Sequence, residues 1–93
     1  TKNMKQERFY VYVLLSWKDK KFYIGYTNNL KRRSQEHAHG EVKSTVSRLP
    51  LKLIHYEYFI NEEDAKAREV FLKSGHGHEQ LKNILKRTLN KPN

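Results

Sequence analysis

The 93-residue chain contains no cysteine and no long hydrophobic run. Without cysteine there is no disulfide bond, no thiolate metal ligand and no cysteine nucleophile; this leaves the redox compartment open and suits the cytoplasmic location that we expect. The longest run of apolar and aromatic residues, 9–15, has seven residues. A membrane span needs about 20 such residues, so no membrane association is expected.

Acidic residues are also scarce relative to basic ones. Ten Asp and Glu stand against 19 Lys and Arg, which gives a formal net charge of +9. Such a charge favours polyanionic partners, although ribosomal proteins and basic enzymes share it. A chain of this length forms one modest core, so we expect a single domain over residues 1–93, with its core at about 8–89, in which any function shares one body.

The hydrophobic pattern predicts an α/β (α+β) fold with a three-stranded sheet flanked by helices. The first strand is apolar on both faces and should be central. The third is expected to alternate, with Lys52 and Tyr56 on the same face. The predicted elements, in the order β-β-α-β-α-α, are strands at 9–15, 22–26 and 51–59 and helices from 27–29 to about 39, from Asn61 to about 74, and from 78 to 89, with a loop at 40–50.

The first predicted helix carries two adjacent arginines with different surroundings. At about 100° per residue, Arg33 borders the inner side of the helix and Arg32 points the other way, to solvent. Arg33 and His37 are four residues apart and can reach a common site. The inner side itself is formed by Leu30, Ser34, His37 and Ala38.

Two strand tyrosines, Tyr12 and Tyr23, are candidates for chemistry. In an antiparallel hairpin they share a sheet face, opposite or diagonal to each other, so their hydroxyls can converge. Ordinary aromatic packing is the competing interpretation. Gly25 interrupts the second strand, which indicates either a β-bulge or the close approach of a substrate.

Glu69 lies beside the apolar stripe of the second predicted helix. A carboxylate there must be paired, hydrated or bound to a cation, because burying it alone is costly. A salt bridge to Lys66 or Lys73 and a metal ligand are the two interpretations.

Two His-x-His pairs, at 37–39 and 76–78, superficially suggest a metal site. Residues two apart diverge on a helix and no cysteine supports a zinc site, so we interpret these histidines as surface or phosphate-facing residues.

Four segments together resemble the GIY-YIG nuclease family: YVY at 10–12, FYIG at 22–25, NNLKRR at 28–33 with His37, and AREVFLKSGHG at 67–77. The likeness covers about residues 8–82 and is closest to small, stand-alone bacterial members that are similar to the nuclease half of the excision-repair excinuclease. The spacing makes it specific, since Tyr23 follows Tyr12 by 11 positions and Arg33 follows Tyr23 by ten. The first triad reads Tyr-Val-Tyr in place of Gly-Ile-Tyr, and the DNA-targeting domain of larger members is not expected.

This resemblance implies a three-stranded antiparallel sheet with helices and phosphodiester hydrolysis aided by one divalent ion, Mg²⁺ or Mn²⁺. Carried over by position, it implies catalytic roles for Tyr12, Tyr23, Arg33, His37 and Glu69, with Gly25 as the motif glycine. Glu69 would be the metal ligand and Arg33 would bind a phosphate oxygen. The general base stays open between a tyrosine, whose unperturbed pKa of about 10 is unfavourable, and His37.

The remaining cations are expected to contact nucleic acid, DNA rather than RNA, through its phosphates. The sequence contains no motif for base-specific reading, which favours structure-selective or weakly selective cutting, in DNA repair or processing. A non-catalytic nucleic-acid-binding module and a basic scaffold for acidic partners are the alternatives. The predicted phosphate contacts are Lys31, Arg32, Lys43, Arg48, Lys52, Lys82, Lys86 and Arg87.

Overall fold

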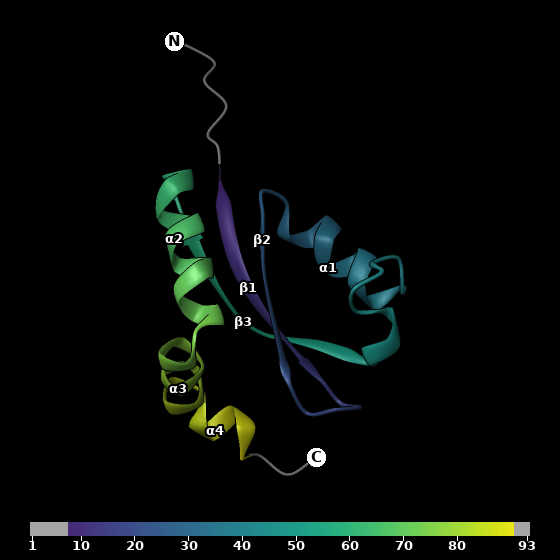
Figure 1. The fold of residues 1–93 in the computed structure, drawn as a ribbon. Coiled ribbons are helices and arrows are strands. Elements are labelled where there is room, and N and C mark those ends of the chain that lie inside the picture. The colour runs from purple at the N-terminus through teal and green to yellow at the C-terminus, as the bar shows by residue number, and fades with distance from the viewer. Residues whose placement is uncertain (1–7, 91–93) are drawn as a thin grey trace.

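A computed structural model describes residues 8–90, which form a three-stranded antiparallel sheet with helices on both of its faces (Figure 1). The strands β1 (Phe9–Ser16), β2 (Phe22–Thr27) and β3 (Leu51–Phe59) lie in the order β2-β1-β3. The predicted fold class and the central position of the first strand are therefore confirmed. The outermost parts of the predicted domain, 1–7 and 91–93, lie outside the described residues.

The first two helices begin at side-chain caps that lie where the sequence predicts the helix starts. Asn29 caps α1 (Leu30–Ala38) through the Arg32 amide, and Asn61 caps α2 (Glu62–Lys73) through two amides of its first turn. A 3-10 turn, η1 (Val46–Arg48), lies in the loop before β3. Within residues 8–90, no helix combines the length and the hydropathy that crossing a membrane requires.

The last predicted helix, 78–89, ends where expected but differs from the structure at its start and in its interior. It begins earlier, as α3 (Gly75–Ile84), and is interrupted at Leu85 before α4 (Lys86–Leu89). The early start has a local cause, because Ser74 accepts a hydrogen bond from the Gly77 amide at 3.1 Å. A glycine is also needed at position 77, because a Cβ there would overlap the Phe71 carbonyl oxygen.

The two faces of the sheet have different coverings. The face called here the α2 face packs against α2 and α3, and the opposite face, the α1 face, lies toward α1 (Figure 1). Aliphatic side chains from the α2 face and its helices form the hydrophobic core. The buried members of this core are Phe9, Val11, Val13, Ile24, Ala65, Leu72, Leu81 and Leu85.

A β-bulge in β3 corrects the predicted alternation of that strand. Val13 of β1 pairs with His55, but Leu14 pairs with Leu53, so Ile54 is an extra residue without a partner in the register. Since one extra residue reverses the direction of the side chains beyond it, Lys52 shares a face with His55 and not with Tyr56.

Candidate active site

Three buried polar side chains form a hydrogen-bonded chain on the α1 face. The Tyr12 hydroxyl lies 2.9 Å from His37 Nε2, and His37 Nδ1 lies 2.8 Å from the Thr45 hydroxyl. Tyr12 and His37 are each only 1% exposed, and Thr45 is fully buried. The strand β1, the helix α1 and the loop after α1 each supply one member. This hydrogen-bonded series is therefore assembled by the tertiary fold, because its members come from three separate segments.

Tyr23 lies against the same pair of rings. Its ring centroid is 5.1 Å from that of His37 and 6.4 Å from that of Tyr12. Tyr12 is paired across the strands with Gly25, so the two tyrosines are diagonal neighbours on one face. The structure thus brings together the two tyrosines and the histidine that the sequence places there.

The structure explains the glycine at position 25 differently from both expectations. The pairing of β1 with β2 is regular at this point, so there is no bulge between these two strands. The Tyr12 ring lies directly over Gly25, where a Cβ would overlap the phenol oxygen. The close approach is made by a side chain of the protein itself.

Arg33 reaches the same site from α1. Its guanidinium interacts with the Tyr12 hydroxyl and donates a hydrogen bond of 2.9 Å to Glu36 Oε1. The Arg33 side chain is 35% exposed, whereas Arg32 is 59% exposed and lies 3.5 Å from the other oxygen of Glu36. The predicted difference between the two arginines is thus present, but Ala38, expected on the inner side, is exposed because α1 ends there.

The pKa shifts of the buried pair follow from its surroundings. Burial raises the pKa of the Tyr12 phenol above its usual value, and the hydrogen bond with Arg33 opposes this. Burial, with the charge of Arg33, lowers the pKa of His37, so the imidazole is neutral at pH 7. When the Tyr12 phenol donates its proton to His37 Nε2, the ring proton of His37 is on Nδ1 and is donated to the Thr45 hydroxyl.

Glu69 approaches the site from α2. Burial is the main cause of the raised pKa of Tyr12, and the negative charge of the Glu69 carboxylate adds to it. The Glu69 carboxylate also forms an ion pair with Lys73 at 2.9 Å, and this is one of the two ion pairs that the sequence suggests. The Glu69 side chain is 22% exposed.

The donor set limits the metal that the site can hold. Among residues 8–90, no group of three His, Cys, Asp or Glu side chains converges, so a cage made by protein ligands alone does not fit. One carboxylate at a partly exposed position fits Mg²⁺ or Mn²⁺, which keep several waters and bind substrate phosphate. The His-x-His pairs form no such group either. His37 is buried in the tyrosine site, which corrects its interpretation as a surface or phosphate-facing histidine.

Thr45 is the member of the site that the sequence analysis missed. It lies in the stretch from 40 to 50, which has no hydrophobic period and was expected to be a plain loop. A hydroxyl that holds the far side of a histidine ring has no local sequence signal. Only the close packing of this loop on α1 reveals it.

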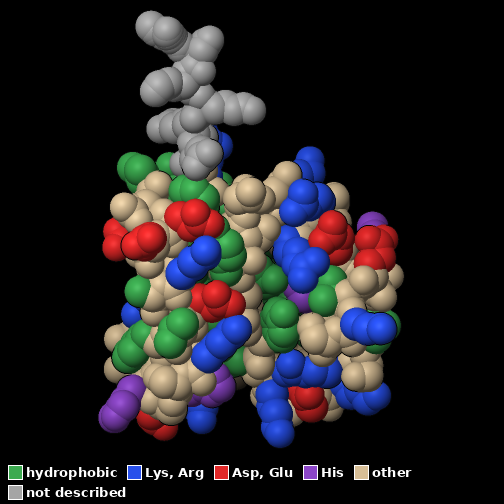
Figure 2. Space-filling model, turned by 45° about the horizontal axis from the view of Figure 1, so that its top comes forward, with side chains coloured by type: hydrophobic (Ala, Val, Ile, Leu, Met, Phe, Trp, Pro, Cys, Tyr) green, Lys and Arg blue, Asp and Glu red, His purple; other side chains and the backbone are tan. Residues whose placement is uncertain are grey.

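Most of the predicted phosphate contacts are exposed. Figure 2 shows Lys and Arg side chains on both halves of one face, more of them on the right, over α1 and the segment after it. Arg48 differs, because its guanidinium is bonded to Asp19 at 3.0 Å and to the carbonyl oxygens of Lys21 and Phe22. Arg48 thus stabilises the β1–β2 turn. Its contact with phosphate stays a prediction. The exposed members of the predicted set are Lys31, Arg32, Lys43, Lys52, Lys82, Lys86 and Arg87.

Comparison with known proteins agrees with this arrangement. The sequence description of the GIY-YIG catalytic domain matches residues 8–83, nearly all of the described chain. The chain belongs to the GIY-YIG family. The match spans both tyrosines, Arg33, His37 and Glu69, so the hydrogen-bonded site lies within the GIY-YIG domain.

Individual GIY-YIG relatives are small proteins of similar length. The chain is 36% identical over 85 residues to a UPF0213 protein of Clostridium perfringens, covering 90% of each, and 44% identical over 78 residues to one of Pediococcus acidilactici, covering 80% of this chain and 78% of that protein. The solution structure of a UPF0213 protein from Bacillus halodurans matches with a TM-score of 0.53 at 36% identity, over 83% of this chain and 84% of that one. These names specify neither substrate nor reaction. The family match by itself shows a nuclease-type domain.

Proposed function

We propose that this protein is an endonuclease that hydrolyses phosphodiester bonds in DNA with the help of one Mg²⁺ or Mn²⁺ ion, with selectivity for the shape of the nucleic acid and not for its base sequence. The observation that carries the proposal is the hydrogen-bonded Tyr12–His37 pair, with Arg33 and Glu69 within electrostatic reach of the phenol. The family match and the net charge of +9 support the same class of substrate.

The general-base step is a transfer of protons across the buried Tyr12–His37 pair. Because burial raises the pKa of Tyr12, a free phenolate is not the base. The attacking water gives its proton to the Tyr12 oxygen, and the proton of Tyr12 passes to His37 Nε2, which is neutral at pH 7. Thr45 keeps the His37 ring in the tautomer that can accept this proton.

The other residues bind and orient the substrate. Tyr23 is less buried than Tyr12 and holds the water above the pair. Arg33 binds a non-bridging phosphate oxygen, and its rigid fork of donors suits this geometry better than a lysine would. Glu69 would hold the divalent ion, which supplies Lewis-acid stabilisation of the charge on the phosphate and the leaving oxygen.

Cleavage of plasmid, branched and single-stranded DNA in the presence of Mg²⁺ or Mn²⁺ tests the proposal. Glu69→Gln should lower the rate by about 100-fold or more, since each factor of ten corresponds to about 1.4 kcal/mol and a metal supplies several kcal/mol. Glu63→Gln, an exposed position of the same helix, should cleave like the unaltered protein. Absence of cleavage, or equal rates for both variants, would refute the proposal.

One observation favours a second candidate, a nucleic-acid-binding module without turnover. Glu69 is paired with Lys73 at 2.9 Å, as in a purely structural salt bridge. This candidate predicts salt-dependent binding of DNA that is unchanged or tighter in Glu69→Gln and no strand breaks with either metal. Metal-dependent strand breaks would exclude it.

A further inference from the structure

Three tyrosines form a separate cluster on the α1 face. The Tyr10 ring centroid lies 5.9 Å from that of Tyr56 and 5.7 Å from that of Tyr58. Tyr56 is 53% exposed and Tyr58 is 44% exposed, so these rings contribute little to the core. We call Tyr10, Tyr56 and Tyr58 the tyrosine platform. Its large aromatic area in water has no structural explanation within residues 8–90.

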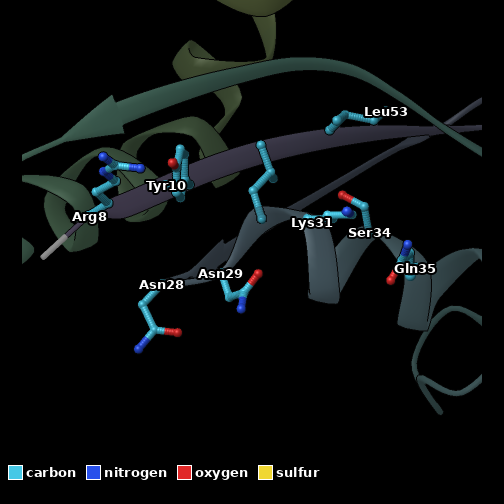
Figure 3. Close-up of a pocket in the computed structure, with 9 residues that line it drawn as sticks. Arg8, Tyr10, Asn28, Asn29, Lys31, Ser34, Gln35 and Leu53 are labelled. Atoms are coloured by element: carbon cyan, nitrogen blue, oxygen red, sulfur yellow. The ribbon is translucent and has the colours of Figure 1, made fainter.

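A groove of about 630 Å³ lies beside the platform and includes Tyr10 in its wall. Figure 3 shows that the wall is built from the start of β1, the turn before α1, the first turns of α1, and β3. The nine described residues that line it include two cations and no acid. They are Arg8, Tyr10, Asn28, Asn29, Leu30, Lys31, Ser34, Gln35 and Leu53.

The chemistry of these side chains matches that of unpaired nucleotides. Exposed aromatic rings stack with nucleobases, and cations beside them bind the phosphates. The side-chain amides of Asn28 and Gln35 can both donate and accept hydrogen bonds, as the edges of bases require.

Paired bases cannot use this surface. In a duplex the base faces are stacked on one another, so only a single strand can lay a base flat on a tyrosine ring. We propose that the tyrosine platform and its groove bind unpaired nucleotides of a single-stranded segment of DNA or RNA. This is a binding site beside the active site, and its existence does not depend on hydrolysis.

The platform also lies close enough to the active site to share one strand with it. Tyr10 and Tyr12 are two residues apart on β1, so their side chains leave the same face about 7 Å from each other. The two sites have different environments, since Tyr12 is covered and hydrogen-bonded whereas Tyr56 and Tyr58 of the platform are open to solvent. A strand held on the platform would therefore lead toward the site at Tyr12.

Binding of labelled oligonucleotides in EDTA tests this proposal separately from cleavage, because EDTA removes the metal. The probes are fluorescein-labelled oligo(dT) and oligo(U) of about 12 nucleotides, a length within the site sizes of single-strand binders, and a duplex of equal length. Fluorescence anisotropy should show that the unaltered protein binds a single strand more tightly than the duplex. Comparison of oligo(dT) with oligo(U) identifies the preferred sugar.

Substitutions locate the binding. Tyr56→Ala and Tyr58→Ala should each weaken single-strand binding by about 5- to 100-fold, as expected for loss of one stacked base. Tyr56→Phe keeps the ring and should bind within about twofold of the unaltered protein, because stacking does not need the hydroxyl. Phe71→Ala removes an exposed ring of α2 that is not part of the platform, and it should leave binding unchanged.

Crosslinking gives a second measurement that does not depend on variants. An oligonucleotide containing 5-iodouracil, irradiated on the unaltered protein, should attach to peptides that contain Tyr10, Tyr56 or Tyr58. Attachment only elsewhere, or equal binding by Tyr56→Ala and Phe71→Ala, would overturn the proposal. So would a dimer in sedimentation that Tyr56→Ala dissociates while oligonucleotide binding persists, since the platform would then serve self-association.

Discussion

The two faces of the sheet are buried by different means. On the α2 face, fully buried aliphatic side chains such as Val13 and Leu72 pack together and need no specific partner. On the α1 face the buried Leu14 lies beside three buried polar side chains, Tyr12, His37 and Thr45, and each of these three has a hydrogen-bond partner. The difference indicates that the α2 face supplies most of the stability, whereas the α1 face holds side chains in positions that suit chemistry.

The cost of each arrangement also differs. Aliphatic burial stabilises by roughly 25 cal/mol per Å², regardless of direction. A buried hydroxyl or imidazole contributes little net free energy but is costly to leave unpaired. Substitutions on the α2 face should therefore act on stability, and those on the α1 face should act on geometry and activity as well.

The largest effect on stability is expected at the α2 face. Leu72→Ala should lower the free energy of unfolding by about 2–5 kcal/mol, because it leaves a cavity at a fully buried position. Val70→Ala, on the same helix but 70% exposed, should change it by less than about 0.5 kcal/mol. Urea unfolding measures both, and similar values for the two variants would contradict the assigned core.

A smaller effect is expected where the Tyr12 ring lies over Gly25. Gly25→Ala should destabilise by about 1–3 kcal/mol, because the added methyl group overlaps the phenol and displaces it from His37. At Gly75, a helical position, an added Cβ meets open space, so Gly75→Ala should be neutral or slightly stabilising. Thermal unfolding by circular dichroism compares the two, and an unchanged melting temperature for Gly25→Ala would be inconsistent with this packing.

The hydrogen bond of Thr45 should contribute less. Thr45→Val keeps the shape but leaves His37 Nδ1 unpaired, at a cost of about 1–2 kcal/mol in the free energy of unfolding. The His37 ring nitrogens, followed by ¹⁵N NMR, should lose their preference for one tautomer. Thr88→Val, at an exposed position, is the matched control. A retained tautomer in Thr45→Val would show that another group orients the ring.

The smallest expected effect is the pH dependence of stability that His37 produces. Its pKa is lowered in the folded protein from a usual value of 6.5, so below pH 6.5 the unfolded chain binds more protons than the folded one. Stability due to neutral His37 is therefore complete above pH 6.5 and is lost as the pH falls through the folded-state pKa. His37→Gln should make the melting temperature less dependent on pH in this range, whereas His39→Gln, at an exposed position, should not. Parallel profiles for His37→Gln and the unaltered protein would contradict the shift.

The sequence predicts the elements that local signals define. The strand patterns, the caps at Asn29 and Asn61, and the helical spacing of Arg33 and His37 all depend on neighbours within a few residues, and the structure contains them. The spacing of the tyrosines was sufficient to place them on one face because their hairpin has a regular register.

Features that depend on distant contacts were not predictable in the same way. The bulge at Ile54 is set by pairing with β1, and Arg48 pairs with Asp19 and the β1–β2 turn across the fold. Thr45 joins the site only because its loop packs on α1. None of these leaves a periodic or compositional trace in the chain. The predicted strand face is wrong for that reason, and the ion pair of Arg48 and the place of Thr45 were not foreseen.

The most direct measurement of the central claim is a crystal structure with Mn²⁺ and an uncleaved phosphodiester analogue, with the metal located by anomalous scattering. The account predicts a manganese ion bonded to the Glu69 carboxylate, with Arg33 on the phosphate and the Tyr12–His37 hydrogen bond retained beside it. Glu69 still paired with Lys73, with manganese absent or bound elsewhere, would contradict it.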